Sequence, residues 1–174
     1  HSFPTRRSSD LKESKMANLS DASGTMTIHA PNLAILFEIL KDHRNEKQNS
    51  EFYTRYYTDL LEIKESMSDT DIWMFLVHHT EQKAEATIEL EFEAIGRWEY
   101  DNNIRHFVLQ DLTKNLPKSM YVNLPFMKDQ FLTGRFTYHD EEPGCDVNCD
   151  VITEYTYDLN TRVTKTKDLL YLTH

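Results

Sequence analysis

The chain has 174 residues and a net charge of −10 at pH 7, with 39% apolar and 11% aromatic residues. A chain of this length suits one domain, and this apolar content is enough to build a core. The negative charge repels phosphate backbones and anionic lipid surfaces, so we expect no nucleic-acid partner and no membrane partner. The longest apolar run, 72–77, is far shorter than the stretch of about twenty residues that crosses a bilayer.

The first residues differ in character from the rest of the chain. Residues 1–11, HSFPTRRSSDL, resemble the translation of a sequencing-library adapter. We therefore treat residues 1–15 as artefactual or leader sequence and take Met16 as the first plausible start. Residues 16–30 are small and polar and predict a flexible lead-in, so a single domain is expected over 31–174. The lack of a signal-like segment after Met16 and the presence of only two cysteines favour a cytoplasmic location.

Two helices are predicted near the front of the domain. Apolar residues at helical spacing from Leu33 to Leu40 predict a helix over 32–44. Ser50 can cap a second helix that runs to about residue 66. Because the connector between them is short, we expect the two helices to be antiparallel neighbours. The apolar stripe of the second helix would consist of Tyr53, Tyr56, Tyr57, Leu60 and Leu61.

The middle of the chain carries mixed patterns. Ser68 and Asp71 match a capping box, which indicates a helix start, and a long helix could follow. However, apolar residues alternate with glutamates over 86–94, and 72–79 is rich in β-branched and aromatic residues. We favour two strands over these ranges, with the long helix as the open alternative. A further helix is predicted over 104–115.

The last third of the chain predicts three consecutive strands with short connections, an antiparallel meander over 131–173. Lys165 and Lys167 suit an exposed edge strand. The expected fold is therefore α+β, with an N-terminal antiparallel helix pair over 32–66 packed on an antiparallel sheet. The alternative is a mostly helical N-terminal half followed by a C-terminal β-meander.

The segment 139–150 has the most unusual composition, because carboxylates, two cysteines and a histidine crowd together. An EF-hand loop starting at Asp146 fails, since Val151 and Tyr157 occupy the positions that need Gly and Glu. A zinc site at Cys145, Cys149 and His139 lacks an evident fourth ligand and stays a minor alternative. We interpret the segment as a solvated acidic loop and keep looser metal binding as an alternative. The candidate metal ligands are His139, Asp140, Cys145, Asp146, Asn148, Cys149 and Asp150.

The sequence contains no nucleophile elbow and no Gly-rich phosphate loop, so we predict no catalytic residue and no cofactor. The hypothesis we favour is a non-enzymatic binding module whose acidic surface prefers a basic protein partner. The alternative is a small-molecule-binding pocket protein, or an enzyme of the lyase or isomerase type. A filled core with acid on one outer face would favour the module, and the oligomeric state stays open. The pocket of the alternative would be lined by Tyr53, Tyr56, Tyr57, Trp73 and Trp98.

Overall fold

The protein is an α+β structure built around one antiparallel sheet. The computed structural model describes residues 19–82, 86–97, 100–122, 130–142 and 147–174. Along the chain the elements are β1 (Leu19–Ala30), α2 (Leu33–Lys47), η1 (Phe52–Thr54), β2 (Tyr57–Leu60), α3 (Asp69–His79), β3 (Glu81–Gln82), β4 (Ala86–Arg97), α4 (Tyr100–Thr113), η2 (Lys118–Met120), β5 (Phe131–Glu142), β6 (Val147–Asp158) and β7 (Val163–Thr173).

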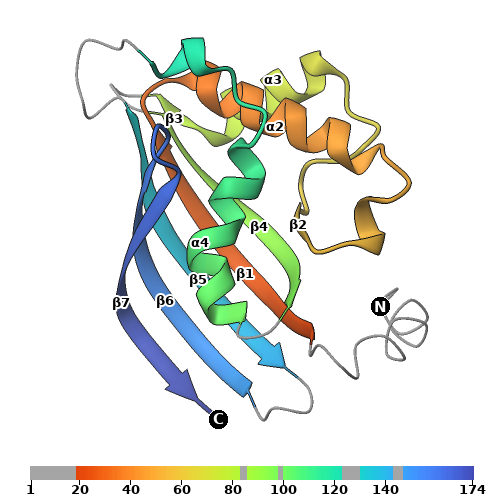
Figure 1. Cartoon of the computed structure of the whole chain (residues 1–174). Helices are drawn as coiled ribbons and strands as arrows, with labels where there is room; N and C mark the ends of the chain where they lie inside the picture. Colours follow the sequence, from red (N-terminus) through yellow and green to blue (C-terminus); the bar gives the residue numbers. More distant parts are fainter. Residues whose placement is uncertain (1–18, 83–85, 98–99, 123–129, 143–146) are drawn as a thin grey trace.

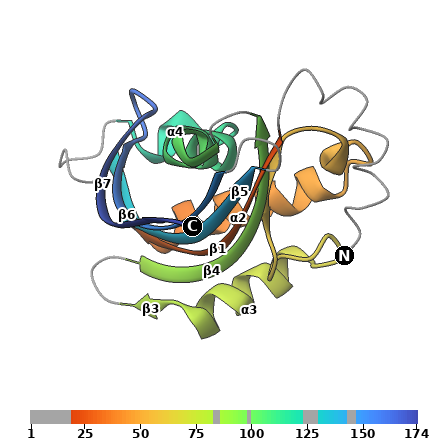
Figure 2. The same ribbon diagram turned by 90° about the horizontal axis from the view of Figure 1, so that it is seen from below.

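The strands lie in the order β2-β4-β1-β5-β6-β7, and β3 also pairs with β4. The sheet curls around α4, which runs along its inner face, while α2 and α3 lie together at one end (Figures 1 and 2). We call the side turned away from α4 the outer face. Among the described residues, no helix is both long enough and apolar enough to cross a membrane.

Two glycines allow β1 and β5 to approach closely where the sheet curves. A side chain at Gly24 would place its Cβ 2.0 Å from the Thr137 carbonyl oxygen, and one at Gly134 would place it 1.9 Å from that of Thr27. Across Gly134, the hydroxyl of Tyr155 donates to the same Thr27 oxygen at 2.7 Å. The two positions therefore exclude any larger residue without a shift of the strands.

The core lies between the inner face of the sheet and the helices. Alternate residues of each long strand point inward, as the two-residue period of a strand requires. Together with the buried stripes of α2 and α4 they form one apolar cluster. Its members include Met26, Ile28, Leu36, Leu40, Phe92, Val108, Leu109, Phe136, Val151 and Tyr157.

The prediction of a flexible lead-in over 16–30 was wrong for residues 19–30, which form β1 between β4 and β5 in the sheet. Every second residue of β1 faces inward, from Ser20 and Ala22 to Met26 and Ile28. Several of these residues are too small to be recognised as apolar. The strand belongs there because its backbone pairs along both edges with β4 and β5.

The helix predicted from Ser50 to residue 66 was also wrong. The chain instead makes the short turn η1 and then β2, whose four residues are all buried. Phe52 and Tyr57 pack with Ile95 in a small second cluster. Contacts with β4 thus override the helical spacing of the tyrosines, so the predicted helix pair does not form.

The strand prediction for 72–79 was wrong, whereas the one for 86–94 was confirmed by β4. Residues 69–79 form α3, and the capping box at its start is complete. The Ser68 hydroxyl accepts the Asp71 N–H at 3.1 Å, and the Asp71 carboxylate accepts the Ser68 N–H at 2.9 Å. The capping box was therefore the more informative signal.

Three further predictions of secondary structure agree with the structure. The helix predicted over 32–44 is α2, and the Asn32 side chain caps it by accepting the Ile35 N–H at 3.0 Å. The helix predicted over 104–115 corresponds to α4. The C-terminal meander was confirmed as β5, β6 and β7, with β7 at the edge of the sheet.

Candidate functional site

The outer face of the sheet is polar, and its side chains stand in rows that the strand register sets. One row reads Glu89, Thr27, Arg135, Glu154 and Lys167 from β4 to β7. Since directly opposed residues of antiparallel strands lie on the same face, each row places its charges side by side. The register therefore defines how charge is distributed over the whole outer face.

The charged side chains on the outer face differ between the β4 side and the β7 side of the sheet. On β4, Glu89, Glu91 and Glu93 follow one another at alternate positions; we call these three residues the acidic column. The outward residues of the neighbouring β1 add Asp21, Ser23, Thr25, Thr27 and His29, none of which is Lys or Arg. On the far side of the sheet, Arg135, Lys165 and Lys167 supply positive charge, and the carboxylates of Glu154 and Asp150 stand on the same face of β6.

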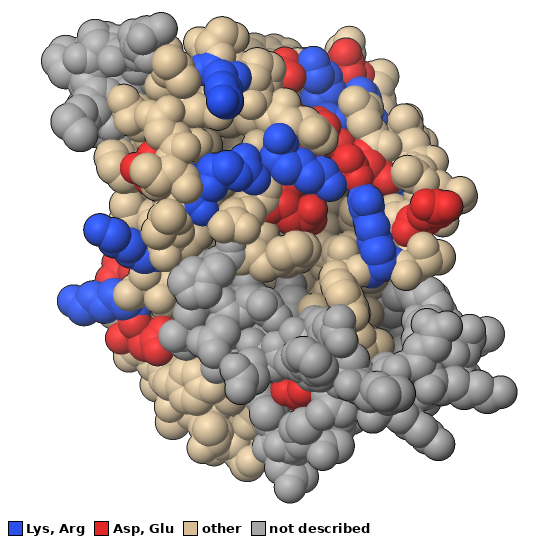
Figure 3. Space-filling view, viewed as in Figure 1, with Lys and Arg blue, Asp and Glu red and all other residues tan. Residues whose placement is uncertain are grey.

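The acidic column concentrates negative charge. Burial raises the pKa of Glu93, and the charges of Asp59 and Asp21 raise it further. No ion pair joins any of the three glutamates to a basic side chain within the described part of the chain. By contrast, on the face that carries α4, acidic and basic side chains are intermingled (Figure 3).

A second set of polar side chains lies near the end of β5 and the start of β6. Asp150 holds two histidines, with His139 Nδ1 at 2.8 Å from Oδ1 and His174 Nε2 at 2.6 Å from Oδ2. The hydrogen bonds from His174 and His139 lower the pKa of the Asp150 carboxyl. Because all three side chains are exposed, the group is a surface network. His139 lies opposite Ser23 on the neighbouring strand.

The predicted metal ligands do not converge. The segment assigned to an acidic loop consists largely of β5 and β6, which run on into it, so successive residues point to opposite faces. His139 and Asp150 are on the outer face, whereas Asp140 and Cys149 are buried on the inner face. Asn148 is opposite Glu141, and Cys145 and Asp146 lie outside the described residues. Within the described part, no three His, Cys, Asp or Glu side chains are grouped to hold a metal ion.

The predicted pocket residues are divided between two aromatic contacts. Tyr53 and Tyr57 pack edge-to-face, with ring centroids 5.2 Å apart, and Tyr57 is buried. Trp73 lies on α3 and packs against Phe37 of α2 at 5.7 Å. Tyr56 is exposed, and Trp98 lies outside the described residues. Tyr57 and Trp73 therefore have packing roles, whereas the Tyr53 hydroxyl donates to the buried Asp59 at 3.0 Å.

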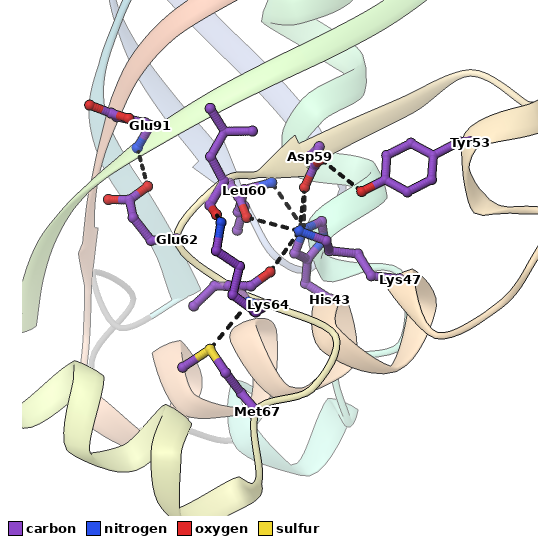
Figure 4. Close-up of polar contacts among 11 residues, drawn as sticks. His43, Lys47, Tyr53, Asp59, Leu60, Glu62, Lys64, Met67 and Glu91 are labelled. Carbon is purple, nitrogen blue, oxygen red and sulfur yellow. Dashed lines mark hydrogen bonds and ion pairs between the residues drawn. The ribbon is translucent and has the colours of Figure 1, made fainter. Parts of the chain in front are cut away.

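A buried ion pair between α2 and β2 was not predicted from the sequence. Lys47 Nζ lies 2.7 Å from Asp59 Oδ1, and both side chains are less than one tenth exposed. The same amine donates to the Ile63 carbonyl at 2.6 Å and to that of Leu60 at 3.4 Å. Figure 4 shows these groups pointing toward one another from the helix and from the chain around β2.

His43 and Tyr53 complete this buried network. The Leu60 N–H donates to His43 Nε2 at 3.0 Å, and the Tyr53 hydroxyl donates to Asp59 Oδ2 at 3.0 Å. Burial lowers the pKa of His43, and the ring accepts a backbone proton in its neutral form. Burial alone would raise the pKa of Asp59, but its contacts with His43 and Lys47 outweigh that effect and lower it to about 2.

The buried network holds the fold together. Every described polar contact of Lys47, His43 and Asp59 is to another part of the same network or to the backbone beside it, and the His43 ring also packs edge-on against Phe52. A signal was present in the sequence, because His43 and Lys47 continue the buried stripe of Leu36 and Leu40 at helical spacing. Polar residues on a buried stripe indicate polar partners elsewhere in the fold.

Comparison with protein-family models, with curated proteins and with solved structures finds no match to this chain.

Proposed function

We propose that this protein is a non-catalytic interaction module that binds a basic segment of a protein partner on the outer face of its sheet. The observation that carries the proposal is the acidic column of Glu89, Glu91 and Glu93, which stands on β4 without a described ion pair. The strand spacing sets these carboxylates about 7 Å apart, which matches alternate residues of an extended basic peptide.

Three features support this reading over a catalytic one. The neighbouring strand β1 adds no basic side chain to the column, so the field there stays negative. The polar groups of Lys47, His43 and Asp59 bind one another and the neighbouring backbone, and these contacts join α2 to β2. The pair of His139 and Asp150 is exposed and borders an open hollow of about 310 Å³, where solvent screens its charges.

The test uses a fluorescent oligolysine peptide and the full chain. We expect binding that weakens steeply between 50 mM and 300 mM salt, because surface charges are screened over about 10 Å at 0.1 M. The variant Glu89→Gln/Glu91→Gln should lower the affinity by about ten-fold, since each surface charge contributes up to about 1 kcal/mol. Both side chains are exposed, so the fold should survive the change.

The matched control is Glu51→Gln/Glu65→Gln, which removes the same charge from exposed positions outside the sheet. It should change the affinity by less than about two-fold. If both variants lost affinity equally, the net charge of the chain would explain binding and the acidic column would have no special role. Failure of the peptide to bind at low salt would refute the proposal.

A further inference from the structure

The strand β7 offers an open edge with an unusual apolar stretch. It pairs with β6 along one side, and no described strand pairs with its other side. Four consecutive residues near its end are exposed: Leu169 at 45%, Leu170 at 37%, Tyr171 at 41% and Leu172 at 50%. A free strand edge that carries exposed apolar side chains is the usual template for adding another strand.

The register identifies which β7 side chains stand on the outer face. Lys165 is opposite Thr156 and Lys167 is opposite Glu154, both exposed residues of β6. After a register shift, Leu170 is opposite Ile152 and Leu172 is opposite Asp150. The outer row of the edge therefore reads Lys, Lys, Leu, Leu along β7.

Lys165 and Lys167 make no described ion pair, although Glu154 of β6 stands opposite Lys167 in the same row. The nearby Arg135 makes no ion pair with another described residue either. All three line a hollow of about 790 Å³ on the outer face, which also contains Glu89 and Glu154. In a chain with a net charge of −10, this hollow holds three cations against two carboxylates, and a local excess of positive charge beside an open edge favours a complementary anionic partner.

We propose that β7 binds an extended segment of a partner protein as an additional antiparallel strand. Read from its N-terminus, this segment places apolar side chains opposite Leu172 and Leu170 and then acidic side chains opposite Lys167 and Lys165. The antiparallel direction follows the rest of the sheet, in which every pairing is antiparallel. This surface is distinct from the acidic column, so the inference does not depend on the proposed function.

A second copy of this chain fits the edge less well than an acidic segment. The outer row of its own β7 carries two lysines and two leucines and no acid, so pairing two copies would leave the lysines without a counter-charge. Backbone hydrogen bonds would form in either case, but side chains decide which strand is accepted. Charge therefore favours a partner with acidic residues at alternate positions.

The test measures binding of labelled synthetic peptides to the full chain by fluorescence anisotropy. The matched probe is Thr-Val-Thr-Val-Thr-Glu-Thr-Glu-Thr. One control has the same composition in reversed order, Thr-Glu-Thr-Glu-Thr-Val-Thr-Val-Thr, and another replaces both Glu by Lys. We expect the matched probe to bind at least about five-fold more tightly than the reversed control. Because the acidic column would also bind the Lys peptide, that control is measured in the Glu89→Gln/Glu91→Gln variant, where the same difference is expected. Binding of the matched probe should also slow hydrogen exchange at β7 amides.

Variants of exposed lysines make the test specific to this edge. Lys165→Glu should weaken the matched probe and strengthen the Lys peptide, whereas Lys165→Gln should weaken the probe without strengthening the Lys peptide. Lys118→Glu, at an exposed position on η2, is the control and should change neither affinity. Equal binding of the two peptide orders, unchanged binding to Lys165→Glu, or no binding at all would overturn the proposal. So would sedimentation showing that the chain alone dimerises through β7.

Discussion

The buried ion pair between Lys47 and Asp59 should make Lys47 one of the least replaceable polar residues of the chain. In Lys47→Met the side chain keeps a similar length and apolar stem, but the ammonium group is lost. Asp59 would then remain buried with a single described donor, the Tyr53 hydroxyl, and the carbonyl of Ile63 would lose a donor at 2.6 Å.

The expected cost follows from this geometry. Removing one partner of a buried pair leaves an uncompensated charge and destabilises a protein by about 3–5 kcal/mol. Replacing both partners with apolar residues, as in Lys47→Met/Asp59→Leu, should recover much of that loss. The two substitutions should therefore be strongly non-additive, with a coupling free energy of about 1–3 kcal/mol.

Urea unfolding followed by far-ultraviolet circular dichroism gives the free energy of unfolding for each variant. The matched control is Lys41→Met, because Lys41 pairs with Glu38 on the surface of the same helix at 3.0 Å. That change should alter stability by about 0.5 kcal/mol or less. A loss below about 1 kcal/mol for Lys47→Met, or simple additivity in the double variant, would refute a structural role for the buried pair.

Three further predictions concern the fold. Since the neighbours of Asp59 lower its pKa from 3.8 to about 2, its contribution is complete above about pH 4. Acid titration of stability should show a loss of about 2 kcal/mol from Asp59 as the pH falls toward 2, and Asp59→Asn should remove that component. Gly134→Ala should cost about 1–3 kcal/mol in urea unfolding, because its Cβ would meet the Thr27 oxygen at 1.9 Å; a neutral effect would contradict the close strand approach. Ser68→Ala should cost about 0.5–2 kcal/mol by thermal unfolding, whereas the exposed Ser66→Ala should cost almost nothing.

Elements whose signals are local could be predicted from the sequence. In the meander over 131–173, β5 and β6 show alternating burial, and α2 has both an apolar stripe and a capping Asn32. The Ser68 and Asp71 capping box marked the start of α3 correctly, although the β-branched and aromatic residues after it favoured a strand. Local hydrogen bonds and side-chain periods were enough in these places.

Elements that depend on distant contacts could not be predicted. The inward residues of β1 are mostly small, so its alternation is visible only once β4 and β5 are known to pair on both sides. The strand β2 buries Asp59, which is acceptable only because Lys47 and His43 come from another element. Helix and strand propensities depend on the residue type and its neighbours in the sequence, so they do not register a buried charge that is paired with a distant residue.

The candidate surfaces were foreseen in part. Alternating glutamates over 86–94 indicated a strand with acid on one side, but their position relative to the lysines of β7 depends on the register of the intervening strands. The described candidates for metal ligands within residues 139–150 lie on two faces of the sheet because β5 and β6 extend into that segment. The lengths of β5 and β6 decide which of these side chains share a face, and the sequence did not show those lengths.

The most direct test of the account is a nuclear magnetic resonance titration of the full chain with the oligolysine peptide. If the outer face is the binding surface, the largest chemical-shift changes will occur at Glu89, Glu91 and the facing residues of β1, and they will disappear in Glu89→Gln/Glu91→Gln. Changes centred on α2 or α4 instead, or spread evenly over the surface, would contradict it.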